Sequence, residues 1–432
     1  MESDPKKMMH MLQQEMGKSL DRISNLPKEI IDEILKRMPI RDAVKTSMLS
    51  TCWRYKWMSI MSDLVFDTHS ILPSVEQANL VNFVYNVLLR HDGTIVTKFV
   101  INKFLECGCS DDVNRWIVVL SRKMLKELEL MFNSSLEWYQ LPTCVFSCKE
   151  LTTLKLNYCI LKLPSGFQGF RHLIRLELHG VCIANEAFET LVTKSPLLVA
   201  VYVFWCYSLT HVKICHAPNL MLFAISGLYE SIKFCNTPNL KMVGLFKSVP
   251  GIGSISFRLD EVVDLLVGIH RVAMSQPFVE LSSSDVFPDK LPLIYPCLKL
   301  ARLDVNFEDS RQILAILCLF RSSPNLEKLE IKVLSDQHSV LSAQECFWES
   351  RLRQEKNVCA RVKYLSMSAF KGMQHELGFV QFIMLNAVML EYVTIKWKGN
   401  DYKNHEKLCI EKKMRQFKKA SSYAEIRFPS QA

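Results

Sequence analysis

The chain carries two different spacings of apolar residues. Between residues 21 and 67 they recur every three or four positions, and from about Val96 onward they repeat as L-x-x-L-x-L. The first spacing is typical of amphipathic helices, and the alternation within the second is typical of strands with one buried face. We therefore predict a short helical region followed by a long region of repeated strands.

The N-terminal region predicts three short helices. In NLPKEIIDEILKRMP, Pro27 suits the first helical position, Pro39 ends the helix, and the apolar residues between them share one face. A second helix is expected at residues 41–48, and a third from about Ser50, which would cap it and place Trp53 and Trp57 on one side. Because such a unit buries little surface by itself, it is expected to rest on a partner or on a following domain.

The repeated spacing is that of leucine-rich repeats, in which each unit contributes one strand. Successive units begin 29, 26, 22, 25, 22 and 20 residues apart, close to the period of about 20–29 residues that is typical of this repeat. The seven units are Val96/Phe99/Ile101, Leu125/Leu128/Leu130, Leu151/Leu154/Leu156, Leu173/Leu176/Leu178, Leu198/Val201/Val203, Leu220/Phe223/Ile225 and Leu240/Val243/Leu245.

The spacing is interrupted at residues 248–296 and then returns. Within the interruption we expect loops around a helix at residues 259–273, and we expect the polar residues 334–358 to form an insertion or a longer helix. The later units are Leu300/Leu303/Val305, Leu326/Leu329/Ile331, Val362/Leu365/Met367 and Leu390/Val393/Ile395.

Two recurring details support the repeat. Cys159 and Cys206 each fall three residues after the third apolar position, where this repeat takes Asn or Cys to bond the turning backbone. SPLL, APNL, TPNL and SPNL each lead into a predicted strand, and Pro and Asn favour a turn that returns the chain to the sheet. Since no unit can cover its own apolar face, the units are expected to stack into one curved solenoid with parallel strands on the concave side.

Composition and charge narrow the class of protein. With 432 residues, 49% hydrophobic and 22% charged, the chain is predicted to be globular. The longest apolar run has eleven residues, at 197–207, against about 20 for a spanning helix. The 15 cysteines are odd in number, and residues 1–20 lack the apolar core of a signal peptide. We therefore expect an intracellular protein, in the cytoplasm or nucleus, with reduced thiols and no membrane partner.

The formal charge of +9 is concentrated toward the C-terminus. Residues 396–419 hold nine basic and three acidic side chains. A solvated helix face is favoured over a nucleic-acid groove, because stacking aromatics and a compact binding motif are missing there. A nuclear import signal is left open as a third interpretation.

No motif for catalysis or for cofactor or metal binding is found. The chain has no phosphate loop, no nucleophile elbow and no H-E-x-x-H zinc motif. Neither Cys107 with Cys109 nor Cys144 with Cys148 has the paired C-x-x-C spacing of structural zinc. We therefore predict a protein that is not an enzyme and that holds no metal or cofactor.

Residues 21–67, DRISNLPKEIIDEILKRMPIRDAVKTSMLSTCWRYKWMSIMSDLVFD, resemble a plant F-box, and with GFVQFIMLNAVMLEYVTI and KKASSYAEIRF the whole chain resembles the F-box/FBD/LRR family. The resemblance implies an α/β fold: an N-terminal three-helix F-box, a leucine-rich-repeat solenoid with helices or loops outside its concave parallel strands, and a C-terminal FBD-like cap. The domains expected are a flexible leader at 1–20, the F-box at 21–67, the solenoid at 68–355 and the cap at 356–432.

The resemblance also implies a function. The F-box would bind the Skp-type adaptor of a cullin-RING (SCF) ubiquitin ligase, and the repeats would present a protein target for ubiquitination. The alternative is a repeat scaffold uncoupled from the ligase, since Thr51, Cys52 and Lys56 depart from the family pattern. The positions that match adaptor-facing or packing residues are Leu26, Pro27, Ile30, Ile34, Leu35, Pro39, Ala43, Val44, Ser47, Leu49, Ser50, Trp53 and Trp57.

The small size of the three-helix unit allows only one interior, so the residues of this set must divide into buried and exposed ones. We expect Ile31 and Leu49 inside, Trp53 mainly in packing, and Leu26, Pro27 and Ile30 on the docking face together with one tryptophan. The target is expected on the concave face, at the variable positions Lys155, Glu177, Tyr202, Ala224 and Gly244.

Overall fold

The computed structural model describes residues 26–51, 53–67, 76–105, 107–133, 138–249, 253–254, 266–275, 290–334, 348, 355, 357–399 and 404–429. The chain forms two compact units. The first is Met1–Ile183 with Lys194–Pro196, and the second is Ala184–Thr193 with Leu197–Ala432. The predicted leader at residues 1–20 lies outside the described residues.

Short helices open the first unit, as predicted. They are α2 (Lys28–Arg37), α3 (Ile40–Lys45), the 3-10 turn η1 (Thr46–Met48) and α4 (Lys56–Ile60). The expected start of the third helix at Ser50 is wrong, since α4 begins at Lys56 and Ser50 does not cap it. Instead the Ser50 carbonyl accepts hydrogen bonds from the amides of Trp53 and Arg54, so the chain turns once more before the helix starts.

A strand that the sequence analysis missed follows these helices directly. Strand β1 (Asp63–Phe66) pairs in parallel with β2 (Lys98–Leu105), in the register Leu64 with Phe99 and Phe66 with Ile101. Leu64 and Phe66 are buried, and the Phe66 ring packs edge-on against Phe83 and Phe99. The three-helix region is therefore hydrogen-bonded into the sheet of the repeats that follow it.

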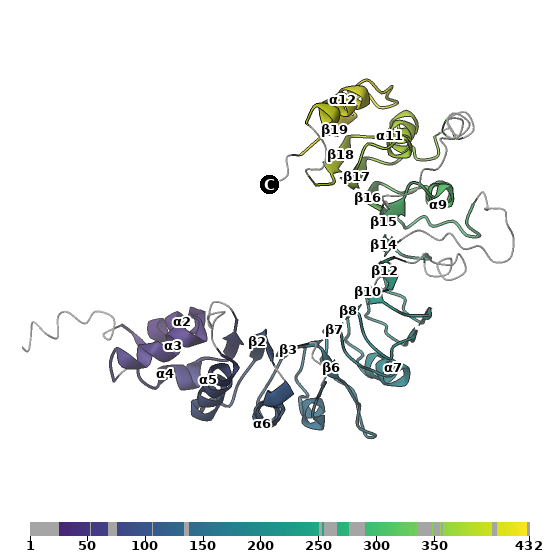
Figure 1. Cartoon of the computed structure of the whole chain (residues 1–432). Helices are drawn as coiled ribbons and strands as arrows, with labels where there is room; N and C mark the ends of the chain where they lie inside the picture. Colours follow the sequence, from purple (N-terminus) through teal and green to yellow (C-terminus); the bar gives the residue numbers. More distant parts are fainter. Residues whose placement is uncertain are drawn as a thin grey trace, which may run out of the picture. The chain divides into compact units, whose positions relative to one another are not determined.

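The first unit contains one parallel sheet in the order β1-β2-β3-β5-β7, with helices on one side of it (Figure 1). Its remaining elements are α5 (Gln77–Arg90), η2 (Cys107–Cys109), α6 (Ser110–Leu120), β3 (Glu127–Phe132), η3 (Thr143–Ser147), β5 (Thr153–Asn157) and β7 (Arg175–His179), with β4 (Tyr139–Gln140) and β6 (Cys159–Ile160) paired separately.

The second unit continues the same architecture in a parallel sheet of order β8-β10-β12-β14-β15-β16-β17-β18-β19. Helices α9 and α11 lie on one side of its later strands (Figure 1). Its elements are α7 (Asn185–Thr193), β8 (Ala200–Phe204), β9 (His211–Cys215), β10 (Leu222–Gly227), β11 (Ser231–Cys235), β12 (Met242–Val249), β13 (Gly253–Ser254), β14 (Arg271–Ser275), β15 (Leu300–Asn306), α9 (Ser310–Ser322), β16 (Lys328–Leu334), β17 (Tyr364–Phe370), α11 (Gln374–Asn386), β18 (Tyr392–Trp397), α12 (Asn404–Arg415) and β19 (Glu425–Arg427).

The predicted repeat strands are confirmed, with two corrections. The helix expected at residues 259–273 is wrong where it is described, because β14 occupies its end and buries Ile269, Val272 and Met274 at the repeat spacing. The unit predicted as Leu300/Leu303/Val305 is shifted by two residues. Strand register aligns Leu300 with Arg271 on the outer face, so the buried trio is Leu298/Ala301/Leu303. Residues 334–358 lie largely outside the described residues.

Two of the recurring turn asparagines connect their repeat to the one before it. The Asn239 side-chain amide donates to the Pro218 carbonyl at 2.7 Å, and Asn325 donates to the Pro296 carbonyl at 2.9 Å. At the other end of the strands, the Cys206 thiol donates to the Phe204 carbonyl at 3.8 Å. The Cys206 bond matches the role expected for that position, whereas the asparagine bonds between repeats go beyond the turn that the sequence predicts.

A buried carboxyl group sits where α11 begins. The Glu376 side chain accepts hydrogen bonds from the backbone amides of Lys371 at 2.8 Å and Gly372 at 2.9 Å. Burial raises the pKa of Glu376 to about 7 from its ordinary 4.5, although these amides act in the opposite direction. The folded chain therefore binds a proton that the unfolded chain releases between these two pH values.

We predict that Glu376→Gln changes the pH dependence of stability. In the natural chain, the contribution of Glu376 to the free energy of unfolding is fully present below pH 4.5 and is lost as the pH rises through about 7. A glutamine keeps an acceptor for the two amides and carries no charge. Between pH 5 and 8, the melting midpoint of the variant should therefore rise relative to that of the natural protein as the pH increases. A constant difference between the two midpoints would contradict the assignment.

Candidate functional site

One face of α2 is apolar and exposed. Ile31 and Leu35 are buried in the interior of the three-helix region, as expected for Ile31. Next to this buried stripe, Ile30 is 48% exposed and Ile34 is 37% exposed, and Pro27 precedes them on the same face at helical spacing. An amphipathic helix ordinarily points charged groups outward, so two exposed isoleucines on one face indicate a surface for a partner.

A second exposed apolar segment lies at the end of η1. Met48 is 88% exposed and Leu49 is 66% exposed, so the expectation that Leu49 packs inside is wrong. The cause is the turn at residues 46–49, in which the buried Thr46 takes the inward place and donates its hydroxyl to the Ala43 carbonyl. We define the N-terminal apolar surface as Pro27, Ile30, Ile34, Met48 and Leu49.

Both tryptophans belong to the interior. Trp53 packs inside as predicted, whereas the expectation of one exposed tryptophan is wrong, because Trp57 is equally buried. The Trp57 indole Nε1 donates to the Ser47 hydroxyl at 3.0 Å, and that hydroxyl donates to the Arg54 carbonyl at 3.0 Å. Trp57 thus holds together the turn between η1 and α4, and it supports the apolar surface without being part of it.

The rest of the predicted adaptor-facing set divides by exposure. Ala43 is buried together with Leu35 and the tryptophans. Leu26, Val44, Ser47 and Ser50 are half-buried, whereas Pro39 is exposed. Of the positions that depart from the family pattern, Thr51 is exposed, Lys56 is half-buried and Cys52 lies outside the described residues.

A buried histidine fastens the three-helix region to the first repeat. His91 follows α5, and its Nε2 donates to the Met61 carbonyl at 2.7 Å. Its Nδ1 accepts from the Lys123 ammonium at 3.3 Å, and Lys123 also donates to the Gly93 carbonyl. Burial lowers the pKa of His91, and the ammonium of Lys123 lowers it further. The neutral ring therefore joins the end of α4, the end of α5 and the segment after α6.

In the first unit, the exposed sheet face carries an alternating row of charges. Lys155 lies in register between Glu129 and Glu177, with its Nζ 3.7 Å and 3.5 Å from their carboxylates. Lys98 pairs with Glu127 in the same way at 2.8 Å. The two predicted target residues Lys155 and Glu177 are thus half-buried partners of each other.

In the second unit, a row of small side chains crosses the sheet. Tyr202, Ala224 and Gly244 are in register on β8, β10 and β12, as expected for neighbouring repeats, and Ala273 follows on β14. The Phe246 ring packs against Gly244, where an added Cβ would lie 3.3 Å from the ring. The row ends at Arg302 of β15, so three small residues lie between a tyrosine and an arginine.

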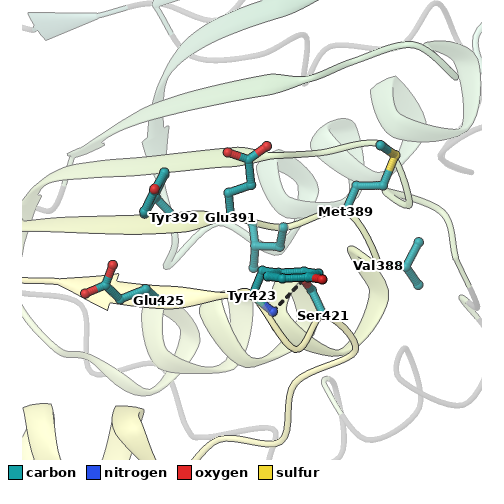
Figure 2. Close-up of a pocket in the computed structure, with 8 residues that line it drawn as sticks. Val388, Met389, Glu391, Tyr392, Ser421, Tyr423 and Glu425 are labelled. Atoms are coloured by element: carbon teal, nitrogen blue, oxygen red, sulfur yellow. Dashed lines mark hydrogen bonds between the residues drawn. The ribbon is translucent and has the colours of Figure 1, made fainter.

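A pocket of about 540 Å³ lies near the last two strands of the second unit (Figure 2). Val388 and Met389 line one end, and the exposed Tyr423 ring lies between them and the carboxylate of Glu425. Glu391 accepts a hydrogen bond from the Tyr364 hydroxyl at 3.0 Å, and Glu425 is paired with Arg427 at 2.8 Å. Because both carboxylates have donors, the pocket offers mainly apolar contact.

The pocket was missed because its two sides, residues 388–392 and 421–425, meet only through strand pairing. Met48 was missed although its position beside Leu49 could have indicated it. The described part of the chain contains no cluster of three or more His, Cys, Asp or Glu side chains around a common point. No helix among the described residues combines the length and hydropathy needed to cross a bilayer.

Comparison with known proteins finds matches along most of the chain. A family model described as the F-box domain matches residues 23–63. A second, described as the LRR repeats of FBD-associated F-box protein At5g56370, matches residues 113–331.

Several proteins of Arabidopsis thaliana are similar over nearly their whole length. F-box/FBD/LRR-repeat protein At1g13570 is 34% identical, covering 89% of this chain and 93% of the relative. Putative FBD-associated F-box protein At1g61330 is 24% identical over 89% and 93% of the two chains. Among solved structures, an internalin of Listeria monocytogenes is 10% identical with a TM-score of 0.34, covering 72% of this chain and 82% of that one, a similarity too low to carry a conclusion.

We predict that Ser47→Ala destabilises the three-helix region. The change removes the acceptor of the Trp57 indole and the donor to the Arg54 carbonyl, so a buried N–H is left without a partner. The free energy of unfolding should fall by about 1–3 kcal/mol, measured by denaturant titration with tryptophan fluorescence. Ser59→Ala is the matched control, because the exposed Ser59 hydroxyl makes only a 3.4 Å bond to the Lys56 carbonyl. Equal losses in the two variants would contradict the role of Ser47.

Proposed function

The chain belongs to the plant F-box/FBD/LRR-repeat family, and on that premise we propose that it is the substrate-recognition subunit of an SCF (Skp–cullin–F-box) ubiquitin ligase. In this role the N-terminal apolar surface binds a Skp-type adaptor, and through it the cullin-RING ligase. The repeats bind a target protein. The complex acts inside the cell, in the cytoplasm or nucleus.

The observation that carries the proposal is the division of α2 into two apolar faces. Ile31 and Leu35 already complete the interior, so Ile30 and Ile34 are not needed for packing within the chain. Burying an exposed isoleucine against a partner contributes on the order of 1–2 kcal/mol. Together with Met48 and Leu49, these side chains supply the apolar centre that stable protein interfaces require.

The attachment of the three helices to the sheet supports the second half of the proposal. A receptor that acts by proximity must hold its target at a defined distance from the ligase, because a flexible joint would dilute the effective concentration of target lysines. Strand β1 and the His91–Met61 hydrogen bond remove such a joint within the first unit. The chain itself then contributes binding and orientation, and we assign it no catalytic step.

Target binding is assigned to the exposed faces of the sheets. Outward side chains of parallel repeats can vary without disturbing the core, so these faces suit recognition. In the second unit the row Tyr202, Ala224, Gly244 and Ala273 presents small side chains next to an aromatic ring. In the first unit Lys155 and Glu177 offer charged groups, each already paired.

We predict that Ile30→Asp combined with Ile34→Asp abolishes adaptor binding. A carboxylate at each position would be buried unpaired in the interface, so the dissociation constant for a purified Skp-type adaptor should rise at least about 30-fold, equivalent to about 2 kcal/mol. Calorimetry or pull-down provides the measurement, and circular dichroism verifies the fold.

The matched control is Leu89→Asp, which places the same group on an exposed apolar side chain of α5, outside the N-terminal apolar surface. It should bind the adaptor as the natural chain does. If the natural chain itself does not bind an adaptor, the protein is a repeat scaffold uncoupled from the ligase. If the double variant binds normally, the surface is wrongly assigned.

We predict that Ala224→Arg removes target binding and keeps adaptor binding. The change replaces a methyl group between Tyr202 and Gly244 with a long cationic side chain, which would obstruct a target that contacts this row. Proximity labelling in plant cells under proteasome inhibition should lose the target proteins, whereas Ala184→Arg, an equal change at an exposed position before α7, should retain them. An unchanged set of labelled proteins in the Ala224→Arg variant would place the target elsewhere.

A further inference from the structure

Two cysteines lie side by side on a small sheet in the second unit. Strands β9 and β11 pair in parallel apart from the main sheet, and Cys215 is in register with Cys235. The strands belong to consecutive repeats, and each cysteine is the last residue of its strand. The next residues, His216 and Asn236, both adopt a left-handed backbone conformation with φ of 54° and 53°. The two repeats therefore turn away from the sheet at the same point.

The two thiols share the outward side of this pair of strands. Val212 and Ile214 of β9 are buried, whereas Lys213 and Lys233, two residues before each cysteine, are exposed. Cys215 is buried and Cys235 is half-buried. Because Cys215 and Cys235 are in register on paired strands, their side chains are neighbours in the reduced protein, and Cys235 is among the groups that raise the pKa of Cys215.

The backbone spacing suits a covalent bond between them. Paired strands lie about 4.7–4.9 Å apart, and disulfides span Cα separations of about 4.4–6.8 Å. Residues in register on parallel strands also point to the same side of the sheet. Closing the bond therefore needs rotation of the two side chains and no shift of the strands.

Cys144 and Cys148, a second pair of cysteines close in the sequence, are less suited to oxidation. Cys144 and Cys148 lie four residues apart in and after η3. Burial, together with the neighbouring Cys144, raises the pKa of Cys148 to about 12. Burial also raises the pKa of Cys144, the more accessible thiol of this pair. The thiol that would meet the oxidant first therefore supplies little thiolate, so this pair serves as an internal reference.

We propose that Cys215 and Cys235 form a reversible dithiol–disulfide site that is oxidised by hydrogen peroxide. The half-buried Cys235 sulfur attacks one peroxide oxygen, the O–O bond breaks, and a sulfenic acid and one water result. The Cys215 sulfur then attacks the Cys235 sulfur, the S–O bond breaks, and a second water leaves as the S–S bond forms. Two thiols lose two electrons in total, and one peroxide is reduced to two waters.

The surroundings assign different roles to the two thiols. Burial raises the pKa of Cys215, and the neighbouring Cys235 acts in the same direction, so Cys215 rests as a neutral thiol. The ammonium group of Lys213, on the same side of the strand, favours the thiolate form of Cys215. Cys235 is the more accessible sulfur and meets the oxidant first, and Cys215 is positioned to resolve the sulfenic acid before a further oxidant arrives.

The bond would join two consecutive repeats on the side away from the main sheet. Cys215 follows β8 and Cys235 follows β10, the strands that carry Tyr202 and Ala224. A disulfide here closes a short loop and restricts the separation of the two repeats. Oxidation would thus stiffen the part of the sheet assigned above to target binding.

The site can be read directly from tryptic peptides of the full-length protein. Cleavage after Lys213, Lys233 and Lys241 gives peptides 214–233 and 234–241, each with a single cysteine. The protein is treated with stoichiometric hydrogen peroxide, its free thiols are blocked with N-ethylmaleimide, and the digest is analysed by mass spectrometry. We expect the two peptides joined with loss of two hydrogens, and separated again by dithiothreitol.

Variants separate this site from general oxidation. Cys235→Ser should abolish the linked peptide, whereas Cys409→Ser, a change at a lone exposed thiol, should leave it in place. The melting midpoint should rise by a few degrees on oxidation of the natural protein and of Cys409→Ser, and not of Cys235→Ser. Recovery of peptides 214–233 and 234–241 only as blocked thiols, at peroxide levels that oxidise Cys409, would overturn the proposal. Linkage without any change in the midpoint would overturn the stiffening.

Discussion

The pairing of β1 with β2 is the contact on which the arrangement of the first unit depends. Strand β1 begins three residues after α4 ends, and its pairing sets the register for the repeats that follow in that unit. Since parallel pairing places every inward residue above the next, Leu64 and Phe66 extend the leucine core back toward the helices. The helices therefore gain from the repeat core the buried area that so small a unit cannot supply alone.

The apolar spacing was sufficient to predict most of the strands, because each repeat buries the same three positions. It failed where one of those positions carries a side chain of atypical size or branching. Ala301 is too small to be recognised as a core residue, so the pattern was read two positions late at β15. Ile269, Val272 and Met274 lack leucine, and the apolar residues before them resembled a helix. Strand β1 is four residues long and has no partner nearby in the sequence.

The residues of the candidate site could be predicted as a set, but the sequence did not show which of them are buried and which are exposed. The family motif contains interior and surface residues in one run, and adjacent residues such as Ile30 and Ile31 take opposite roles. The helical period could separate those two, since they lie about 100° apart. It could not place Leu49 or Trp57, whose exposure depends on the turn between η1 and α4 and on the Ser47 hydrogen bonds. Likewise, the small residues Ala224 and Gly244 are informative only once register has aligned them.

The asparagine hydrogen bonds between repeats bear on how such a chain can change over time. Asn239 reaches back 21 residues to Pro218, and Asn325 reaches back 29 residues to Pro296, yet the bond is the same. The same hydrogen bond therefore forms whatever the number of residues between its donor and its acceptor. Outer connections can therefore lengthen or shorten during evolution while the strands keep their alignment, and whole repeats can be duplicated or deleted without inventing a new junction.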